Sequence, residues 1–146
     1  GRKEIIDWMR NKARPYLFSN TVAPAVVGAT LKCLEILTAS TQLRDKLEAN
    51  TKKFRKAMTE AGFDILPGIH PITPIMFGKY TNCSQLAVDF ANRMLEEGVY
   101  VVAFSFPVVP RGKDRIRVQI SAAHEDEHID FAIEKFIKVG KELGVI

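Results

Sequence analysis

The sequence lacks several features that commonly reveal a function. Its two cysteines, Cys33 and Cys83, have neither metal-site spacing nor the density of a disulfide scaffold, so we predict reduced, buried thiols. Its nine glycines are scattered at caps and turns, which excludes the glycine-rich phosphate loops of Rossmann and P-loop proteins. No G-x-S-x-G motif is present and neither cysteine has an activating context, so nothing supports nucleophilic catalysis by this chain.

Long runs of one residue class are also missing. No stretch reaches the roughly 18 to 20 apolar residues of a membrane helix, and the first ten residues lack the layout of a signal peptide. The largest group of cations, KKFRK at residues 52–56, is interpreted as the solvated side of a helix. We therefore expect no membrane or nucleic-acid partner, although a net charge of +4 suits a small anionic ligand.

Length and composition are those of one ordinary domain. The 146 residues are 47% hydrophobic and 26% charged, which is enough to build a sizeable core. Gly1 has no methionine before it, and a charged helical pattern begins directly after it without a cap. We expect the chain to be a piece of a longer protein.

Hydrophobic periodicity predicts an α+β fold. Helical spacing predicts helices at residues 3–12, 24–39, 41–61, 84–97 and from 126 onward. Short β-rich runs predict strands at 72–77, 99–104 and 115–121, and Pro74 indicates an edge position or a bulge in the first of them. The first helix is predicted to end at Arg14-Pro15, because the residue before proline avoids helical geometry. Residues 14–20, RPYLFSN, are then predicted to form an irregular connector, which its two aromatic residues keep ordered. So few strands predict a small, largely antiparallel sheet with helices on one face.

The predicted strand at 115–121 carries the most informative pattern. Strict alternation places Ile116, Val118 and Ile120 on one face. Arg115, Arg117, Gln119 and Ser121 then share the other face. The planar fork of arginine suits a carboxylate, yet on pattern alone a solvated surface charge and a binding role are equally open.

The segment HEDEH, residues 124–128, matches the H-E-x-x-H string of zinc hydrolases. His124 precedes the predicted helix, so the two rings need not share a helical face, and the remaining histidine, His70, lies in a loop. The acidic residues Glu125, Asp126 and Glu127 instead supply negative charge to the first turn of the last helix. We therefore predict no metal site.

Three segments together resemble the glycine C-acetyltransferase (2-amino-3-ketobutyrate CoA ligase) family, within the α-oxoamine synthase group of pyridoxal 5'-phosphate (PLP) enzymes. They are RPYLFSN at 14–20, PVVP at 107–110 and RIRVQISAAH at 115–124, and the likeness extends to the terminal KELGVI. The resemblance implies the C-terminal part of a PLP-dependent aminotransferase fold. Residues 1–22 would end the cofactor domain and its connector, and residues 23–146 would form the small C-terminal domain.

The resemblance also implies roles for three residues. Arg117 would bind the glycine carboxylate, while Phe18 and Ser19 would reach the PLP phosphate of the neighbouring subunit in a homodimer. The lysine that forms the Schiff base would lie upstream, so this chain holds no catalytic residue and should be inactive alone. Glu125 departs from relatives that often cap the last helix with threonine, and we expect only a stability effect.

The implied reaction joins glycine and acetyl-CoA to 2-amino-3-ketobutyrate and CoA, reversibly, in threonine degradation. Alternatives within the group are 8-amino-7-oxononanoate synthase, 5-aminolevulinate synthase and serine palmitoyltransferase, but PYLFSN favours the acetyl and glycine pair. A non-catalytic, anion-binding α+β module is the alternative from another class. The implied location is cytoplasmic for a bacterial source and the mitochondrial matrix for a eukaryotic one.

Overall fold

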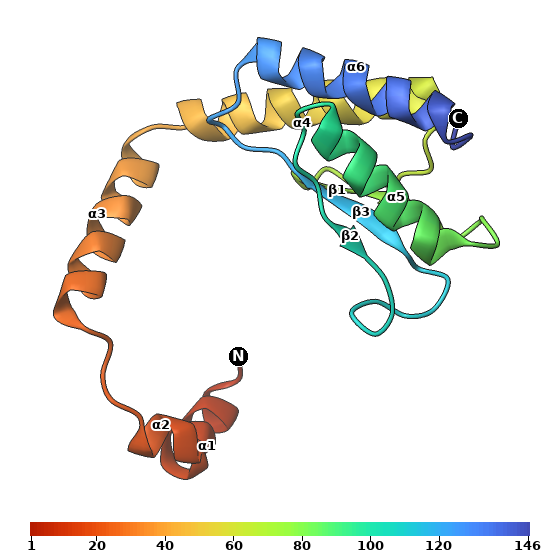
Figure 1. The fold of residues 1–146 in the computed structure, drawn as a ribbon. Helices are drawn as coiled ribbons and strands as arrows, with labels where there is room; N and C mark the ends of the chain where they lie inside the picture. The colour runs from red at the N-terminus through yellow and green to blue at the C-terminus, as the bar shows by residue number, and fades with distance from the viewer. The chain divides into compact units, whose positions relative to one another are not determined.

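The computed structural model describes all residues, 1–146, and they divide into two compact units. The first unit is Gly1–Thr41 and the second is Gln42–Ile146 (Figure 1). The boundary expected at residues 22 and 23 concerns the whole protein and stays a prediction.

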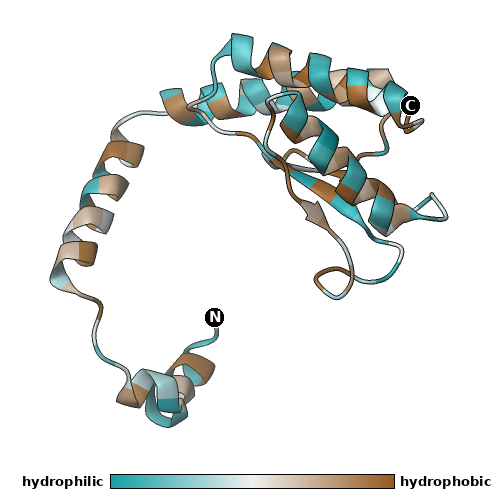
Figure 2. Cartoon of the chain, in the orientation of Figure 1, coloured by the Kyte–Doolittle hydropathy of each residue, from teal (hydrophilic) through white to brown (hydrophobic).

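The first unit contains three helices, α1 (Lys3–Lys12), α2 (Arg14–Phe18) and α3 (Pro24–Ala39), and none of them contains a buried residue. The prediction of an irregular connector is wrong for residues 14–18. Proline is disfavoured inside a helix but suits its first turn, so Pro15 ends one helix and begins the next. Apolar residues run along α3 (Figure 2), and Cys33 on this helix is exposed, not buried as predicted.

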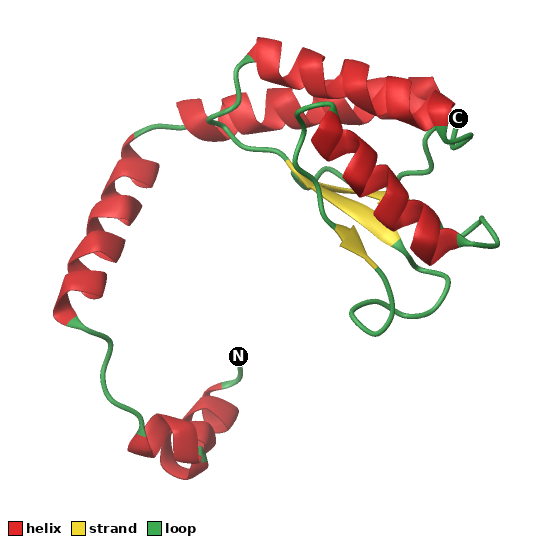
Figure 3. Ribbon diagram, in the orientation of Figure 1, coloured by secondary structure: helices red, strands yellow, loops and turns green.

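The second unit has three helices and a three-stranded sheet (Figure 3). Its elements are α4 (Gln42–Ala61), β1 (Ile72–Met76), α5 (Cys83–Glu96), β2 (Ala103–Phe104), β3 (Arg115–Gln119) and α6 (Asp126–Glu142). Both strand pairs are antiparallel in the order β1-β3-β2, so Pro74 lies on an edge strand, the first of its two predicted placements. The α+β prediction is confirmed.

The core lies between the sheet and these helices. α5 packs on β2 and β3, and α6 packs against α4 and α5. Four phenylalanines meet here mainly edge to face, and the rings of Phe54 and Phe136 lie 5.6 Å apart. Ile116 and Val118 close the core from the sheet side because alternate residues of β3 point toward the helices. No helix of the structure has both the length and the apolar character needed to cross a membrane.

The strand predicted at residues 99–104 forms only at its end. Ala103 and Phe104 pair with β3, and Val102 adds one long bond in which its carbonyl accepts from the Arg117 N–H at 3.4 Å. Before Val102 the chain diverges from β3, and a cavity lies between the two segments. β-Branched residues favour extended backbone, but a strand also needs a partner within hydrogen-bonding distance.

The cations of KKFRK are not all solvated as predicted. Arg55 donates to the backbone carbonyls of Leu66, His70 and Ile72 at 2.9 to 3.3 Å and so fixes the loop that leads into β1. Lys53 pairs with Asp126 and Asp130 of α6, and the Asp130 carboxylate raises the pKa of this lysine. These contacts join α4 to segments far away in the sequence. The residue pattern within one helix cannot predict such contacts.

The last helix begins as the acidic pattern predicts. Glu125 is the N-cap residue, Asp126 and Glu127 occupy the first turn, and Glu125 and His128 form a reciprocal capping box. In that box the His128 Nδ1 atom accepts from the Glu125 N–H at 3.1 Å. The acidic run of HEDEH therefore stabilises a helix start.

Candidate functional site

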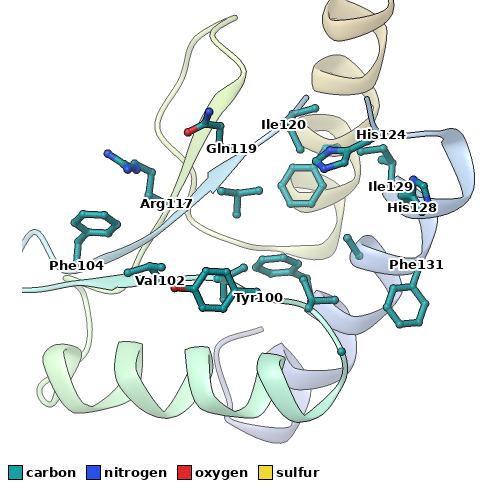
Figure 4. Close-up of a pocket in the computed structure, with 17 residues that line it drawn as sticks. Tyr100, Val102, Phe104, Arg117, Gln119, Ile120, His124, His128, Ile129 and Phe131 are labelled. Atoms are coloured by element: carbon teal, nitrogen blue, oxygen red, sulfur yellow. The ribbon is translucent and has the colours of Figure 1, made fainter. Parts of the chain in front are cut away.

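The second unit contains a cavity of about 740 Å³ between β3 and residues 99–102. Apolar side chains, including Phe54, Ile129 and Phe136, form its inner wall. Figure 4 shows Arg117 and Gln119 of β3 at one end and His124 and His128 at the other. An apolar cavity with a few converging polar groups is the usual form of a small-molecule site.

Arg117 lies on the exposed face of β3, opposite the face that closes the core. Its partner on β1 is Pro74, and Val102 lies across from it on the other side. The guanidinium carbon lies 4.6 Å from the ring centroid of Phe104, which is the diagonal neighbour on β2. The cross-strand neighbours of Arg117, Pro74 and Val102, and the ring of Phe104 are thus all apolar.

No acidic side chain pairs with Arg117 in the structure, and its guanidinium donates no hydrogen bond to the protein. Arg93 on α5 differs, because it binds Glu96, Glu97 and Glu142 and is fully neutralised. A guanidinium has five N–H donors in one plane. Those of Arg117 are available for an anion from outside the unit, and a carboxylate matches their geometry.

Arg115 lies on the same face of β3 but has a different environment. Its Nε atom donates to the Lys113 carbonyl at 2.9 Å, which holds the side chain back on the preceding loop. It does not line the cavity. The structure therefore separates two arginines that strand alternation alone treats as equivalent.

A buried carboxylate fixes the start of β3. Asp114 accepts hydrogen bonds from Ser84 Oγ at 2.6 Å and from Cys83 Sγ at 3.1 Å, both in the first turn of α5. The Ser84 hydrogen bond lowers the pKa of Asp114 although burial opposes it. The hydrogen bond to Asp114 raises the pKa of Cys83, so this half-buried thiol is held protonated.

The loop before β3 also packs closely against the end of β1. Phe77 N–H donates to the Asp114 carbonyl at 2.9 Å. A Cβ atom added to Gly78 would lie only 2.0 Å from the carbonyl oxygen of Gly112, so no larger residue fits there. These backbone contacts and Asp114 together set the position of β3 and hence of Arg117.

The two histidines of the cavity are oriented by the backbone. His124 Nδ1 accepts from the Ser121 N–H at 3.2 Å, and the rings of His124 and His128 lie 6.5 Å apart. Asn50, buried on α4, donates to the carbonyls of Ser121 and His124. Since Nδ1 is the acceptor in both neutral rings, each Nε2 atom carries a hydrogen and is a donor. Both rings line one cavity although His124 precedes the helix.

Phe18 and Ser19 belong to the first unit. Phe18 ends α2 with 74% of its surface exposed, and the Arg14 guanidinium carbon lies 5.2 Å from its ring centroid. Ser19 is the C-cap residue, whose N–H donates to the Pro15 carbonyl at 3.0 Å, while its hydroxyl makes no hydrogen bond within the protein. The Ser19 hydroxyl is thus available to donate to a phosphate oxygen such as those of PLP.

Several residues of the cavity were missed by the sequence analysis. Gln119 was placed on the correct face by alternation but received no role, whereas Phe104, Tyr100 and His124 were not connected with Arg117. The position of Phe104 beside Arg117 depends on the β2–β3 register, which no local pattern contains. The buried pairing of Asp114 joins segments thirty residues apart and had no sequence signal.

Comparison with known proteins agrees with the predicted family. The family model described as "Aminotransferase class I and II" matches residues 1–136. The chain is 48% identical over 145 residues to 2-amino-3-ketobutyrate coenzyme A ligase of Escherichia coli K12, covering 99% of this chain and 35% of that protein. It is 45% identical over its full length to the mitochondrial 2-amino-3-ketobutyrate coenzyme A ligase of Homo sapiens, covering 34% of that protein.

A relative with another name has a similar sequence identity to this chain. The chain is 44% identical to 8-amino-7-oxononanoate synthase of Thermosipho melanesiensis, over 100% of this chain and 36% of that protein. The chain thus spans about a third of the length of the curated relatives it matches. The family resemblance predicted from RPYLFSN, PVVP and RIRVQISAAH is confirmed, because the relatives include 2-amino-3-ketobutyrate coenzyme A ligases.

Solved structures confirm the fold. A high-resolution structure of SPT with a PLP internal aldimine superposes with a TM-score of 0.86 at 23% identity. The match covers 99% of this chain and 36% of that chain. The predicted C-terminal architecture of the PLP-dependent fold is therefore present.

Proposed function

Because the chain belongs to the aminotransferase class I and II family, we propose that it is the C-terminal part of a PLP-dependent acyltransferase. The reaction is the condensation of glycine with acetyl-CoA to 2-amino-3-ketobutyrate and CoA, reversibly, in threonine degradation. Support comes from the 48% identity to a 2-amino-3-ketobutyrate coenzyme A ligase and from the three motifs. A chain about a third as long as its relatives is expected to be inactive alone.

The observation that carries this proposal is the environment of Arg117. Its guanidinium lies on an open sheet face at the end of an apolar cavity, and no acidic side chain neutralises it. A cation with free in-plane donors is suited to a planar carboxylate, and glycine offers one. Arg117 would bind the carboxylate by two parallel hydrogen bonds and so fix the orientation of the amino acid.

PLP supplies an electron sink, which makes the removal of a proton from the glycine Cα accessible. The share of this chain is to bind and to orient. Phe18 and Ser19 would reach the phosphate of PLP in the neighbouring subunit, which requires a homodimer.

A second candidate is another α-oxoamine synthase with different amino and acyl substrates. The 44% identity to an 8-amino-7-oxononanoate synthase favours it, because that protein is nearly as similar as the mitochondrial ligases. Arg117 would bind a carboxylate in either case. The location would be cytoplasmic for a bacterial source and the mitochondrial matrix for a eukaryotic source.

The test uses the full-length protein that contains this chain, loaded with PLP. Arg117→Ala should raise the KM for glycine about a hundredfold, since two charged hydrogen bonds of roughly 1.5 kcal/mol each are lost and 1.4 kcal/mol is a factor of ten. The absorbance of the bound cofactor should stay unchanged.

Two controls interpret that result. Arg115→Ala removes the neighbouring arginine on the same face and should leave the KM for glycine within about a factor of two, because Arg115 is held on its own loop. Comparing acetyl-CoA with longer acyl donors separates the first candidate from the second. Unchanged glycine kinetics in Arg117→Ala would contradict the proposed role of this residue.

A further inference from the structure

We propose that Phe104 is a positioning residue, whose ring orients the guanidinium of Arg117. The guanidinium carbon lies 4.6 Å from the ring centroid, and this contact would hold the in-plane donors ready for an incoming carboxylate. The inference rests on the proposed function, because the carboxylate is that of the amino acid substrate. It assigns a positioning role to a side chain that makes no hydrogen bond itself.

The sheet register explains why these two side chains meet. Phe104 is directly opposite Arg115, so both lie on the open face of the sheet, and Arg117 is two residues farther along β3. Diagonal neighbours on one face are within reach of aromatic and long side chains. The Arg117 guanidinium carbon reaches 4.6 Å from the ring centroid, a distance at which the ring face attracts a cation.

The chemistry of the contact suits a binding arginine better than an ion pair would. An acidic neighbour would orient the guanidinium but would occupy the donors and neutralise the charge, as happens at Arg93. A ring contacts the face of the guanidinium and uses none of its N–H groups. Arg117 therefore keeps its charge and its five donors while losing part of its rotamer freedom before the ligand arrives.

Other stacked arginines do not share this position. Arg111 lies 4.3 Å from the ring of Phe106, and Arg14 lies 5.2 Å from the ring of Phe18. Only the pair of Phe104 and Arg117 lines the cavity. The pair of Phe106 and Arg111, on the loop between β2 and β3, is consequently a matched control with the same chemistry outside the site.

The experiment compares Phe104→Leu with Phe104→Tyr in the full-length, PLP-loaded protein. Glycine binding is measured by isothermal titration calorimetry without an acyl donor, and the KM values for glycine and acetyl-CoA are measured separately. Phe104→Leu should weaken glycine binding about two- to fivefold, the range of an exposed cation–π contact, with the KM for acetyl-CoA unchanged. Phe104→Tyr keeps the ring and should restore wild-type affinity.

A double-mutant cycle distinguishes positioning from a general structural effect. In the Arg117→Ala background, Phe104→Leu should cause no further loss of glycine affinity, because the group it positions is absent. An equal loss in both backgrounds would overturn the inference, as would wild-type affinity in Phe104→Leu. Phe106→Leu should leave glycine affinity unchanged, and a loss matching that of Phe104→Leu would also overturn it.

The cycle keeps the two hypotheses apart. If Arg117→Ala leaves glycine affinity unchanged, the proposed function of Arg117 fails and the inference fails with it. If Arg117→Ala weakens glycine binding strongly while Phe104→Leu has no effect, only the positioning role of Phe104 is lost.

Discussion

The two faces of β3 differ in burial and in polarity, although their residues alternate along one short strand. The covered face packs on the helices, and its residues Ile116 and Val118 are buried in the core. The open face carries Arg117 and Gln119, which are exposed, with Phe104 beside them. Packing within the chain determines the first face, whereas the charge and free donors of the second suit a ligand from outside.

Polar groups make the contrast clearer. On the covered face, Asp114 is buried and its carboxylate accepts from Ser84 and Cys83, but the buried hydroxyl of Thr73 has no partner. On the open face, the donors of Arg117 have no partner within the chain either. An unpartnered buried hydroxyl costs stability, while an unpartnered exposed guanidinium costs little because water solvates it. A missing hydrogen-bond partner therefore lowers stability on the covered face, whereas on the open face it leaves donors available to a ligand.

The largest effect on stability should come from the covered face. Ile116→Ala should lower the free energy of unfolding by about 2 to 5 kcal/mol, because a fully buried side chain is replaced by a cavity. The measurement is a urea titration followed by circular dichroism. Arg117→Ala, one residue away, should change the free energy of unfolding by less than about 0.5 kcal/mol. Equal losses from both substitutions would remove the distinction between the faces.

The next effect concerns the buried carboxylate of the covered face. Asp114→Asn should lower the free energy of unfolding at pH 7 by about 1 to 3 kcal/mol, because charged hydrogen bonds at the start of α5 are weakened. Since folding lowers the pKa of Asp114, its contribution is present above the ordinary carboxyl pKa near 4 and is lost as the pH falls through the lower folded value.

Urea midpoints of wild type and Asp114→Asn, measured from pH 7 downward, should therefore converge in acid. Glu127→Gln is the control, because this exposed carboxyl lies on the first turn of α6, and it should cost less than about 0.5 kcal/mol. A gap between wild type and Asp114→Asn that stays constant down to strongly acidic pH would show that the charge of Asp114 is not the stabilising feature.

A smaller effect of opposite sign is expected at the unpartnered hydroxyl. Thr73→Val should raise the free energy of unfolding by about 1 kcal/mol, because it removes a buried polar atom without a partner and keeps the branched shape. Thr73→Ser keeps the hydroxyl and loses the methyl group, so it should be destabilising. The comparison of thermal midpoints measures both changes. A destabilised Thr73→Val would indicate that the hydroxyl is satisfied in solution.

The smallest effect should come from the open face next to Arg117. Gln119→Thr should change the free energy of unfolding by less than about 0.5 kcal/mol, because the side chain is exposed and makes no hydrogen bond within the protein. Urea titration again gives the value. A loss above about 1 kcal/mol would mean that this face is packed more closely than its exposure indicates.

Local patterns predicted most elements but not their partners. Helical periodicity correctly located α4, α5 and α6, and alternation correctly assigned the faces of β3. The run at residues 99–104 was predicted as one strand from its β-branched residues, yet only its last two residues pair. Propensity describes a segment by itself, whereas pairing depends on how close another segment lies.

The candidate site was likewise predicted only in part from the sequence. Three segments, RPYLFSN, PVVP and RIRVQISAAH, together predicted the family, and the resemblance implied the carboxylate contact of Arg117. The family is now established by the match over residues 1–136. The roles of Arg117, Phe18 and Ser19 stay predictions, because they concern groups outside this chain. Phe104, Asp114 and Asn50 could not be found in the sequence, since each acts through a contact with a distant segment.

The sequence by itself determined the order of the five longer helices, the two faces of β3, the helix start at Glu125 and the family. These properties depend on the periodicity and capping of neighbouring residues, and on motifs that are continuous in the chain. Only the tertiary structure decided which of the two arginines is free, which ring lies beneath it and where the cavity opens. Those properties depend on register and packing between segments far apart in sequence, and such contacts leave no local pattern.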